Sequence, residues 1–139
     1  MKACLIGYNL TNFVLAIILN KKGIKVDILS DINNKYFVSN RTVGISRNNI
    51  NFLKSIIKKN KYFWPINSIK IFNFKNENSK SLEFKENKKE NFFLIKNNDL
   101  QNLFLNKCKK LKNISFKNYN KNELLKLEKK NHYNFIINS

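Results

Sequence analysis

The first thirty residues alternate between apolar runs and one amphipathic segment. Residues Lys2 to Ile6 form an apolar run after the first lysine, which is typical of a parallel strand buried on both faces. From Thr11 to Lys22 apolar side chains recur at helical spacing, with Thr11 as the expected N-cap and Gly23 as a left-handed stop. β-Branched residues then alternate from Ile24 to Leu29. This order predicts a right-handed parallel β-α-β unit of the Rossmann type.

The rest of the chain predicts two more helices and five short strands. One helix starts at a cap, Ser46 or Asn48, and ends near residues 58–61, and the other covers Asp99 to Leu111 with Asn98 or Asp99 as its cap. Residues 31–40 read as a loop and 122–130 as a short polar helix or loop. Strands are expected at Ile66 to Phe74, Ser81 to Phe84, Phe92 to Ile95, Ile114 to Phe116 and Tyr133 to Ile137.

These elements predict an α/β fold with two sheets. The first three of those five strands are expected to form a small antiparallel side sheet. The last two are expected to join the strands of the β-α-β unit in one parallel sheet, with residues 2–6 near its centre. A chain of 139 residues is long enough for one compact domain or for part of a larger one.

The formal net charge of +18 raises the question of an anionic partner. Among 27 basic residues only Arg41 and Arg47 carry the guanidinium fork that suits bases and phosphates, so we interpret the lysine excess as compositional drift and expect no specific nucleic-acid binding. The alternative is a non-catalytic, basic Rossmann-like module that binds nucleic acid or a protein partner. The aromatic side chains among the lysines are interpreted as sheet core, not as base-stacking platforms: Phe72, Phe74, Phe84, Phe92 and Phe93.

Metal, thiol and membrane chemistry have little support in the sequence. Cys4 and Cys108 form no CxxC pair, so both are expected to be reduced core thiols without a metal. His132, the only histidine, has no partner at catalytic spacing and is read as a loop residue, and no catalytic residue is assigned. No secretory signal is evident and the apolar run at residues 13–19 is too short to span a bilayer, which predicts a cytoplasmic protein.

The turn after the first strand holds the candidate ligand site. A dinucleotide fingerprint has three glycines there, but this chain keeps only Gly7 and has Asn9 and Asn12 at the second and third positions. Asparagine tolerates positive φ, so the turn can persist, whereas a side chain at Asn9 crowds a pyrophosphate. Ser30 stands where an acid would bind the ribose, and Asp31 is either its substitute or a loop carboxylate.

Further motifs give the chain a family resemblance. The segment Arg41-Thr-Val-Gly-Ile-Ser46, with Phe52-Leu53 after it, resembles the Arg-x-x-Ala-Leu-Ser stretch and Phe-Leu pair of the flavin monooxygenases of ubiquinone biosynthesis, the 2-octaprenylphenol hydroxylase family. Trp64-Pro65-Ile66 is similar to the start of the family's substrate-side hairpin, and residues 95–101 to its Asn-Arg-Asp-Leu-Gln segment. The run Tyr133 to Ile137 is similar to the strand before the family's Gly-Ala-Asp-Gly turn.

The resemblance implies part of a two-domain flavoprotein. Residues 1–139 would form a partial FAD-binding domain, with residues 62–96 as a side-sheet segment that belongs to the substrate domain. Arg41 would lie close to the flavin, and Asn98 stands where the family has a cofactor-contacting arginine. The implied cofactor set is therefore FAD, bound weakly or not at all by this chain alone, with NAD(P)H as the reductant in an intact member.

The implied function is hydroxylation of the aromatic ring of a polyprenyl phenol, by a chain that is an N-terminal segment or a degenerate relative and is not active alone. Its expected partner is a complementary chain or the missing C-terminal half. The lipid-like substrate also implies peripheral contact with the inner membrane. Without the later strands, Phe and Ile side chains on one face of the side sheet are expected to remain uncovered.

Overall fold

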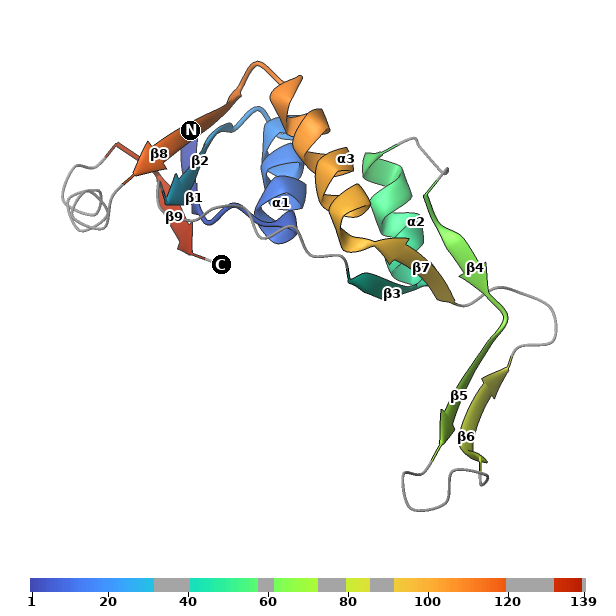
Figure 1. The fold of residues 1–139 in the computed structure, drawn as a ribbon. Helices are drawn as coiled ribbons and strands as arrows, with labels where there is room; N and C mark the ends of the chain where they lie inside the picture. The colour runs from blue at the N-terminus through green and yellow to red at the C-terminus, as the bar shows by residue number, and fades with distance from the viewer. Residues whose placement is uncertain (32–40, 58–61, 73–79, 86–91, 120–131, 139) are drawn as a thin grey trace. The chain divides into compact units, whose positions relative to one another are not determined.

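The computed structural model describes residues 1–31, 41–57, 62–72, 80–85, 92–119 and 132–138, which fall into two compact units (Figure 1). The first unit comprises residues 1–40 and 98–139, and the second comprises residues 41–97. The interpretations made for residues 32–40, 58–61 and 122–130, and the interpretation of Phe74 as sheet core, lie outside the described residues.

The first unit contains a parallel sheet of four described strands. These are β1 (Lys2–Ile6), β2 (Lys25–Asp31), β8 (Ile114–Tyr119) and β9 (Phe135–Asn138), in the order β8-β2-β1-β9. Ala3 lies opposite Val26 on one side and Phe135 on the other. The predicted parallel sheet with the first strand inside it is therefore confirmed, and the burial of β1 from Ala3 to Ile6 explains its unbroken apolar run.

Two helices among the described residues belong to this unit. Helix α1 (Leu10–Lys21) buries Phe13, whose ring lies 6.4 Å from that of Phe116 on β8. Helix α3 (Asn97–Lys109) lies beside α1 (Figure 1), and the Cys108 thiol donates a hydrogen bond of 3.4 Å to the Phe13 carbonyl. Because side chains alternate along a strand, Asp27 and Leu29 point to the face opposite to the one that α1 covers.

The helix ends differ from the sequence prediction at two caps. Helix α1 begins one residue before Thr11, and its N-cap is Asn9, whose extended backbone lets the side chain accept from a first-turn amide. Helix α3 begins at Asn97, so the expected caps Asn98 and Asp99 lie inside its first turn. The stop at Gly23 is confirmed by its φ of 77°.

The second unit confirms the expected antiparallel side structure, but its strands are grouped differently from the prediction. Strand β7 (Phe92–Lys96) pairs with β3 (Thr42–Ser46) and β4 (Trp64–Ile66) in an antiparallel sheet. Strands β5 (Ser68–Phe72) and β6 (Lys80–Lys85) form a separate hairpin. The expected strand Ile66 to Phe74 therefore splits at Asn67.

Helix α2 (Arg47–Ile56) follows β3 directly, with Ser46 as its N-cap, which is one of the two predicted caps. The strand β3 itself was not predicted, because Gly44 interrupts its apolar positions and its ends are polar. Its strand geometry depends on β7, where Ile45 lies opposite Phe93 and Val43 opposite Ile95. Long-range pairing thus decided the conformation of this segment.

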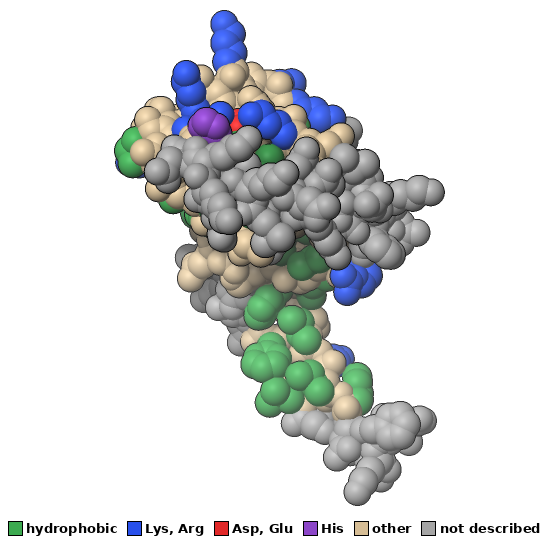
Figure 2. Space-filling model, turned by 90° about the vertical axis from the view of Figure 1, so that its left-hand side faces the viewer, with side chains coloured by type: hydrophobic (Ala, Val, Ile, Leu, Met, Phe, Trp, Pro, Cys, Tyr) green, Lys and Arg blue, Asp and Glu red, His purple; other side chains and the backbone are tan. Residues whose placement is uncertain are grey.

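The hairpin β5–β6 exposes its apolar side chains. Phe72 is 56% exposed and Phe84 is 50% exposed, so their interpretation as sheet core was wrong, whereas Phe93 on β7 is buried. Figure 2 shows hydrophobic side chains gathered over this part of the surface. The expected uncovered face is therefore present, and an isolated two-stranded hairpin of this kind is only marginally stable by itself.

This exposure predicts that the hairpin's apolar side chains add little to stability. Replacing Leu82 and Phe84 together by serine should change the free energy of unfolding by less than ~1 kcal/mol and should reduce binding of a hydrophobic dye. As the control, Phe93→Ala should cost ~3 kcal/mol, because Phe93 is buried. Urea unfolding and dye fluorescence measure both effects. A stability loss in the serine variant as large as that of Phe93→Ala would mean that the hairpin is packed in solution.

Both cysteines are buried and free, as expected. Burial, helped by the neighbouring Asp27 carboxylate, raises the pKa of the Cys4 thiol to about 11. Burial alone raises the pKa of the Cys108 thiol to about 12. At neutral pH both are therefore protonated and poor nucleophiles. Among the described residues, no helix is long and apolar enough to cross a membrane.

Candidate functional site

The candidate site is built on the turn between β1 and α1. Gly7 has a φ of 115°, a conformation that side chains rarely adopt, and its N–H donates a 2.9 Å hydrogen bond to the Leu29 carbonyl. The turn therefore leaves β1 while it stays bonded to β2. This geometry requires the one glycine of the fingerprint that the chain retains.

Asn9 occupies the second glycine position and caps the helix. Its side-chain oxygen accepts a 2.9 Å hydrogen bond from the Asn12 N–H, and its carbonyl accepts from the Phe13 N–H. A glycine here would leave the backbone open to a ligand, whereas the Asn9 side chain lies over the first turn of α1. The Asn9 side chain therefore stabilises the helix and also occupies space beside the helix N-terminus, where a ligand would bind.

Asn12 occupies the third glycine position and turns inward. It is fully buried, and its side-chain amide donates to the Ile6 carbonyl at 2.9 Å and to the Gly7 carbonyl at 2.8 Å. In a standard fingerprint this position is a glycine because helix and strand pack closely. Here an amide fills the space and supplies two hydrogen bonds to the turn.

The turn thus presents the N-terminus of α1, and the asparagine side chains hold that helix end in place. A helix N-terminus favours an anion. Tyr8 packs edge-on against Phe13 with ring centroids 4.8 Å apart, which ties the middle of the turn to the buried side of α1. Gly7, Asn9 and Asn12 therefore lie together in one hydrogen-bonded turn. That this turn binds a phosphate stays a prediction.

The end of β2 holds the two candidate ribose ligands. Ser30 is nearly buried, and its hydroxyl donates a 3.0 Å hydrogen bond to the side-chain oxygen of Asn118 on β8. Asp31 is the last residue of β2 and lies opposite Tyr119, but its side chain is outside the described residues. Ser30 is therefore engaged with β8, and a ribose contact at Asp31 stays a prediction.

The two remaining candidates lie at the start of β3 and of α3. Arg41 is exposed and belongs to the second unit, and its carbonyl accepts a 2.9 Å hydrogen bond from the Asn97 N–H. Asn98, the next residue, is half-buried in the first turn of α3. This main-chain contact of Arg41 is therefore with Asn97, the residue before Asn98.

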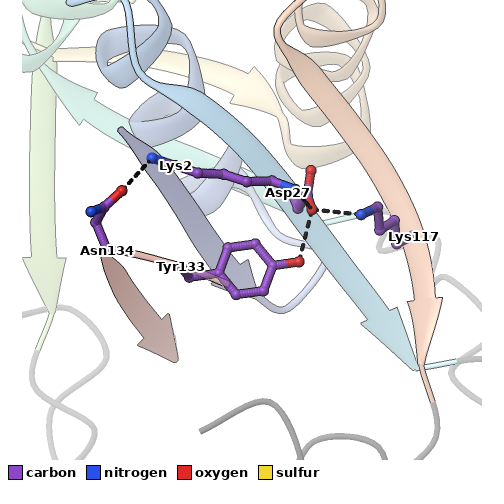
Figure 3. A network of polar contacts seen from close by, with 5 residues as sticks. All are labelled: Lys2, Asp27, Lys117, Tyr133 and Asn134. Carbon is purple, nitrogen blue, oxygen red and sulfur yellow. Dashed lines mark hydrogen bonds and ion pairs between the residues drawn. The ribbon is translucent and has the colours of Figure 1, made fainter. Parts of the chain in front are cut away.

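Sequence reasoning missed a buried carboxylate in the first unit (Figure 3). Asp27 is 3% exposed, and its Oδ2 atom lies 2.9 Å from Lys2 Nζ and 2.7 Å from Lys117 Nζ. The Tyr133 hydroxyl donates to the same oxygen at 2.7 Å. Beside it, the side-chain oxygen of Asn134 accepts a 2.7 Å hydrogen bond from the Lys2 main-chain N–H.

This network keeps Asp27 ionised. Burial by itself raises the pKa of the carboxyl group, but the hydrogen bonds from the two lysines and the tyrosine outweigh it, so the pKa of Asp27 is lowered. Burial and the adjacent carboxylate raise the pKa of Tyr133, which stays a hydrogen-bond donor. A lone acid inside an apolar strand was the only signal of this network in the sequence.

Comparison with known proteins gives the fold a context. No family model matches the chain, and no curated protein matches its sequence. Among solved structures, it is similar to p-nitrophenol 4-monooxygenase PnpA from Pseudomonas putida DLL-E4, with a TM-score of 0.66 and 15% identity over 84% of this chain and 31% of that one. It is also similar to PqsL, a probable FAD-dependent monooxygenase from Pseudomonas aeruginosa, with a TM-score of 0.66 and 11% identity over 85% and 32%.

A third similar structure is CtdE in complex with FAD and a substrate, with a TM-score of 0.64 and 15% identity over 84% of this chain and 30% of that one. The chain therefore shares its α/β fold with a part of each of these structures. It spans about three tenths of the length of each of these structures.

Proposed function

We propose that this chain is the FAD-binding, N-terminal portion of a flavin-dependent hydroxylase that acts on an aromatic ring. The observation that carries the proposal is the turn at Gly7, which leads from a central parallel strand into α1 in a chain with a flavoprotein monooxygenase fold. FAD, when bound, supplies the oxygen chemistry of such a reaction, and NAD(P)H supplies the electrons.

For the substrate, we propose a polyprenyl phenol of ubiquinone biosynthesis. The support is the order of motifs along the chain: the segment from Arg41 to Ser46, Trp64-Pro65-Ile66, residues 95–101 and residues 133–137 follow the order of the 2-octaprenylphenol hydroxylase family. Three of these motifs coincide with strands of the structure, namely β3, β4 and β9. A polyprenyl chain is insoluble in water, which favours peripheral contact of the protein with a membrane.

The residues of the turn would hold the pyrophosphate of FAD. The N-terminus of α1 offers it main-chain N–H groups and the positive end of the helix dipole, and the turn at Gly7 leads the chain into that helix. Asp31 would contact the ribose, and Arg41 would pair with a phosphate or lie near the flavin. The Asn9 side chain occupies part of the approach, so FAD affinity should be weaker than with a glycine at this position.

We further propose that catalysis requires polypeptide beyond these 139 residues, supplied by the same chain or by a complementary one. The support is twofold: the chain spans about three tenths of the similar monooxygenases, and the hairpin β5–β6 exposes Ile71, Phe72, Leu82 and Phe84. An apolar surface of this kind favours a protein contact.

The turn can be tested by FAD titration of two variants at Asn9. Asn9→Gly restores the second fingerprint glycine, so FAD should bind about tenfold more tightly, equivalent to ~1.4 kcal/mol. Stability should fall by only a few tenths of a kcal/mol, because glycine is itself a tolerated N-cap. Calorimetry and quenching of flavin fluorescence measure the affinity.

Asn9→Asp provides the matched control. Aspartate keeps the capping oxygen and the size of the side chain but adds a negative charge beside the proposed pyrophosphate, so FAD binding should weaken while the helix remains stable. Equal FAD affinity in the wild type and both variants would place the cofactor elsewhere and contradict the proposed site.

A further inference from the structure

A pocket lies where the parallel strands β1 and β2 begin, at the end of the sheet opposite to the turn at Gly7. Its volume is about 260 Å³, and it is lined by Lys2, Lys25, Asp27, Lys112, Asn113 and Ser115. Lys2 and Lys25 are the first residues of neighbouring parallel strands, whereas Gly7 follows the carboxyl end of β1. The five-residue strand β1 is roughly 16 Å long, so the pocket at its start is distinct from the turn at Gly7 after its end.

The described lining of this pocket carries an excess of positive charge. Three lysines face a single carboxylate, that of Asp27, and a fourth lysine, Lys117, binds the same carboxylate. The four ammonium groups and one carboxylate leave a net charge of +3 on these described residues. Because like charges repel, an anion in the pocket would lower the electrostatic energy of the site.

The Asp27 network keeps part of this charge in a defined position. Lys2 Nζ lies 2.9 Å from Asp27 Oδ2 and 5.1 Å from the ring centroid of Tyr133. Lys25 and Lys112 make no ion pair with a described residue. Lys25 is the first residue of β2, and Lys112 lies two residues before β8. Two lysines are therefore oriented by protein contacts, and two are available to a ligand.

The pocket also contains polar groups that suit a phosphate. Asn113 and Ser115, whose side chains carry an amide and a hydroxyl, line it beside the lysines. A phosphate accepts several hydrogen bonds and carries about two negative charges at neutral pH, and lysine is a common point-charge partner for it. A pocket below the usual range of ~300–1,000 Å³ for drug-sized ligands suits a small molecule.

We propose that this pocket binds a small phosphate-bearing molecule. The phosphate contacts Lys25 and Lys112 directly, and Asn113 and Ser115 donate hydrogen bonds to it. Lys2, held by Asp27, adds positive charge to the lining of the pocket. This site is independent of the proposed FAD site, because it lies at the other end of the parallel strands and uses none of the same residues.

Titration with pyrophosphate, followed by the amide resonances of the folded chain, tests the proposal. Saturable shifts are expected at Lys25, Asn113 and Ser115, with no comparable shift at Gly7 or Asn9. The double variant Lys25→Gln/Lys112→Gln should bind pyrophosphate about tenfold more weakly. The control variant Lys70→Gln/Lys85→Gln removes the same charge from the hairpin β5–β6 and should leave the affinity unchanged.

Three results would overturn the proposal. The first is the absence of saturable binding at millimolar pyrophosphate, and the second is an equal loss of affinity in both lysine variants, which indicates general attraction to a basic surface. The third is a set of shifts centred on Gly7, which indicates an anion at the α1 N-terminus. Binding of a short DNA oligonucleotide checks for this general attraction. If the oligonucleotide binds more tightly than pyrophosphate and loses affinity equally in both lysine variants, the surface attracts anions without a specific site.

Discussion

Replacing Asp27 by asparagine should lower the free energy of unfolding by about 3 kcal/mol at neutral pH. The carboxylate is buried and accepts from three donors, so the exchange leaves Lys2 and Lys117 without their counter-charge. Tyr133 also loses an ionised acceptor. The loss is large because the network joins β1, β2, β8 and the segment before β9.

The same network makes stability depend on pH in a defined direction. The pKa of Asp27 is lower in the folded chain, so its contribution is complete above the unfolded-state value of about 3.9 and is lost as the pH falls through the lower folded value. Urea unfolding from pH 7 to pH 2 should show this loss in the wild type. The Asp27→Asn variant should lack this component of the acid dependence.

Asp99→Asn is the control for this prediction. Asp99 lies in the first turn of α3, where its charge interacts with the helix dipole, so its removal should cost less than about 1 kcal/mol. If Asp27→Asn were no more destabilising than Asp99→Asn, the contacts to the Asp27 carboxylate would contribute little to the fold.

The second large effect is expected at Asn12. Replacing Asn12 by alanine should cost about 2–3 kcal/mol, because the Ile6 and Gly7 carbonyls lose their amide donor inside the protein and a small cavity is left. Asn12→Gly should be at least as destabilising, although it restores a fingerprint glycine. Thermal and urea unfolding measure both variants.

A matched control exists on α2. Asn49 stands three residues after the N-cap Ser46, just as Asn12 stands three residues after the N-cap Asn9, but Asn49 is exposed. Asn49→Ala should therefore change stability by less than ~0.5 kcal/mol. A similar small effect for Asn12→Ala would mean that the turn does not depend on the buried amide.

Asn9 and Asn12 have roles in the turn at Gly7 that the sequence alone does not reveal. In the sequence they only replace the second and third glycines of a dinucleotide fingerprint, which preserves the signal for the fold and weakens the signal for a bound dinucleotide. In the structure Asn9 caps α1 and Asn12 bonds the turn to the end of β1, so each residue has a structural role. The role of an asparagine depends on where its side chain points, which spacing does not determine.

The sequence by itself determined the elements whose signal is local. The apolar run at residues 2–6, the helical spacing after it and the stop at Gly23 predicted the β-α-β unit, and the two late apolar runs predicted the other strands of the parallel sheet. These predictions succeeded because burial of a strand on both faces, or of a helix on one, imposes a residue pattern within a few positions.

Tertiary structure alone decided the features that depend on distant partners. Strand β3 exists because β7 pairs with it, and the hairpin β5–β6 separates from that sheet because β4 pairs with β7 instead. The charge of Asp27 is stabilised by Lys117 and Tyr133, which lie 90 and 106 residues away along the chain. Contacts over such separations leave no periodic mark on either segment, because each residue type is compatible with many other environments.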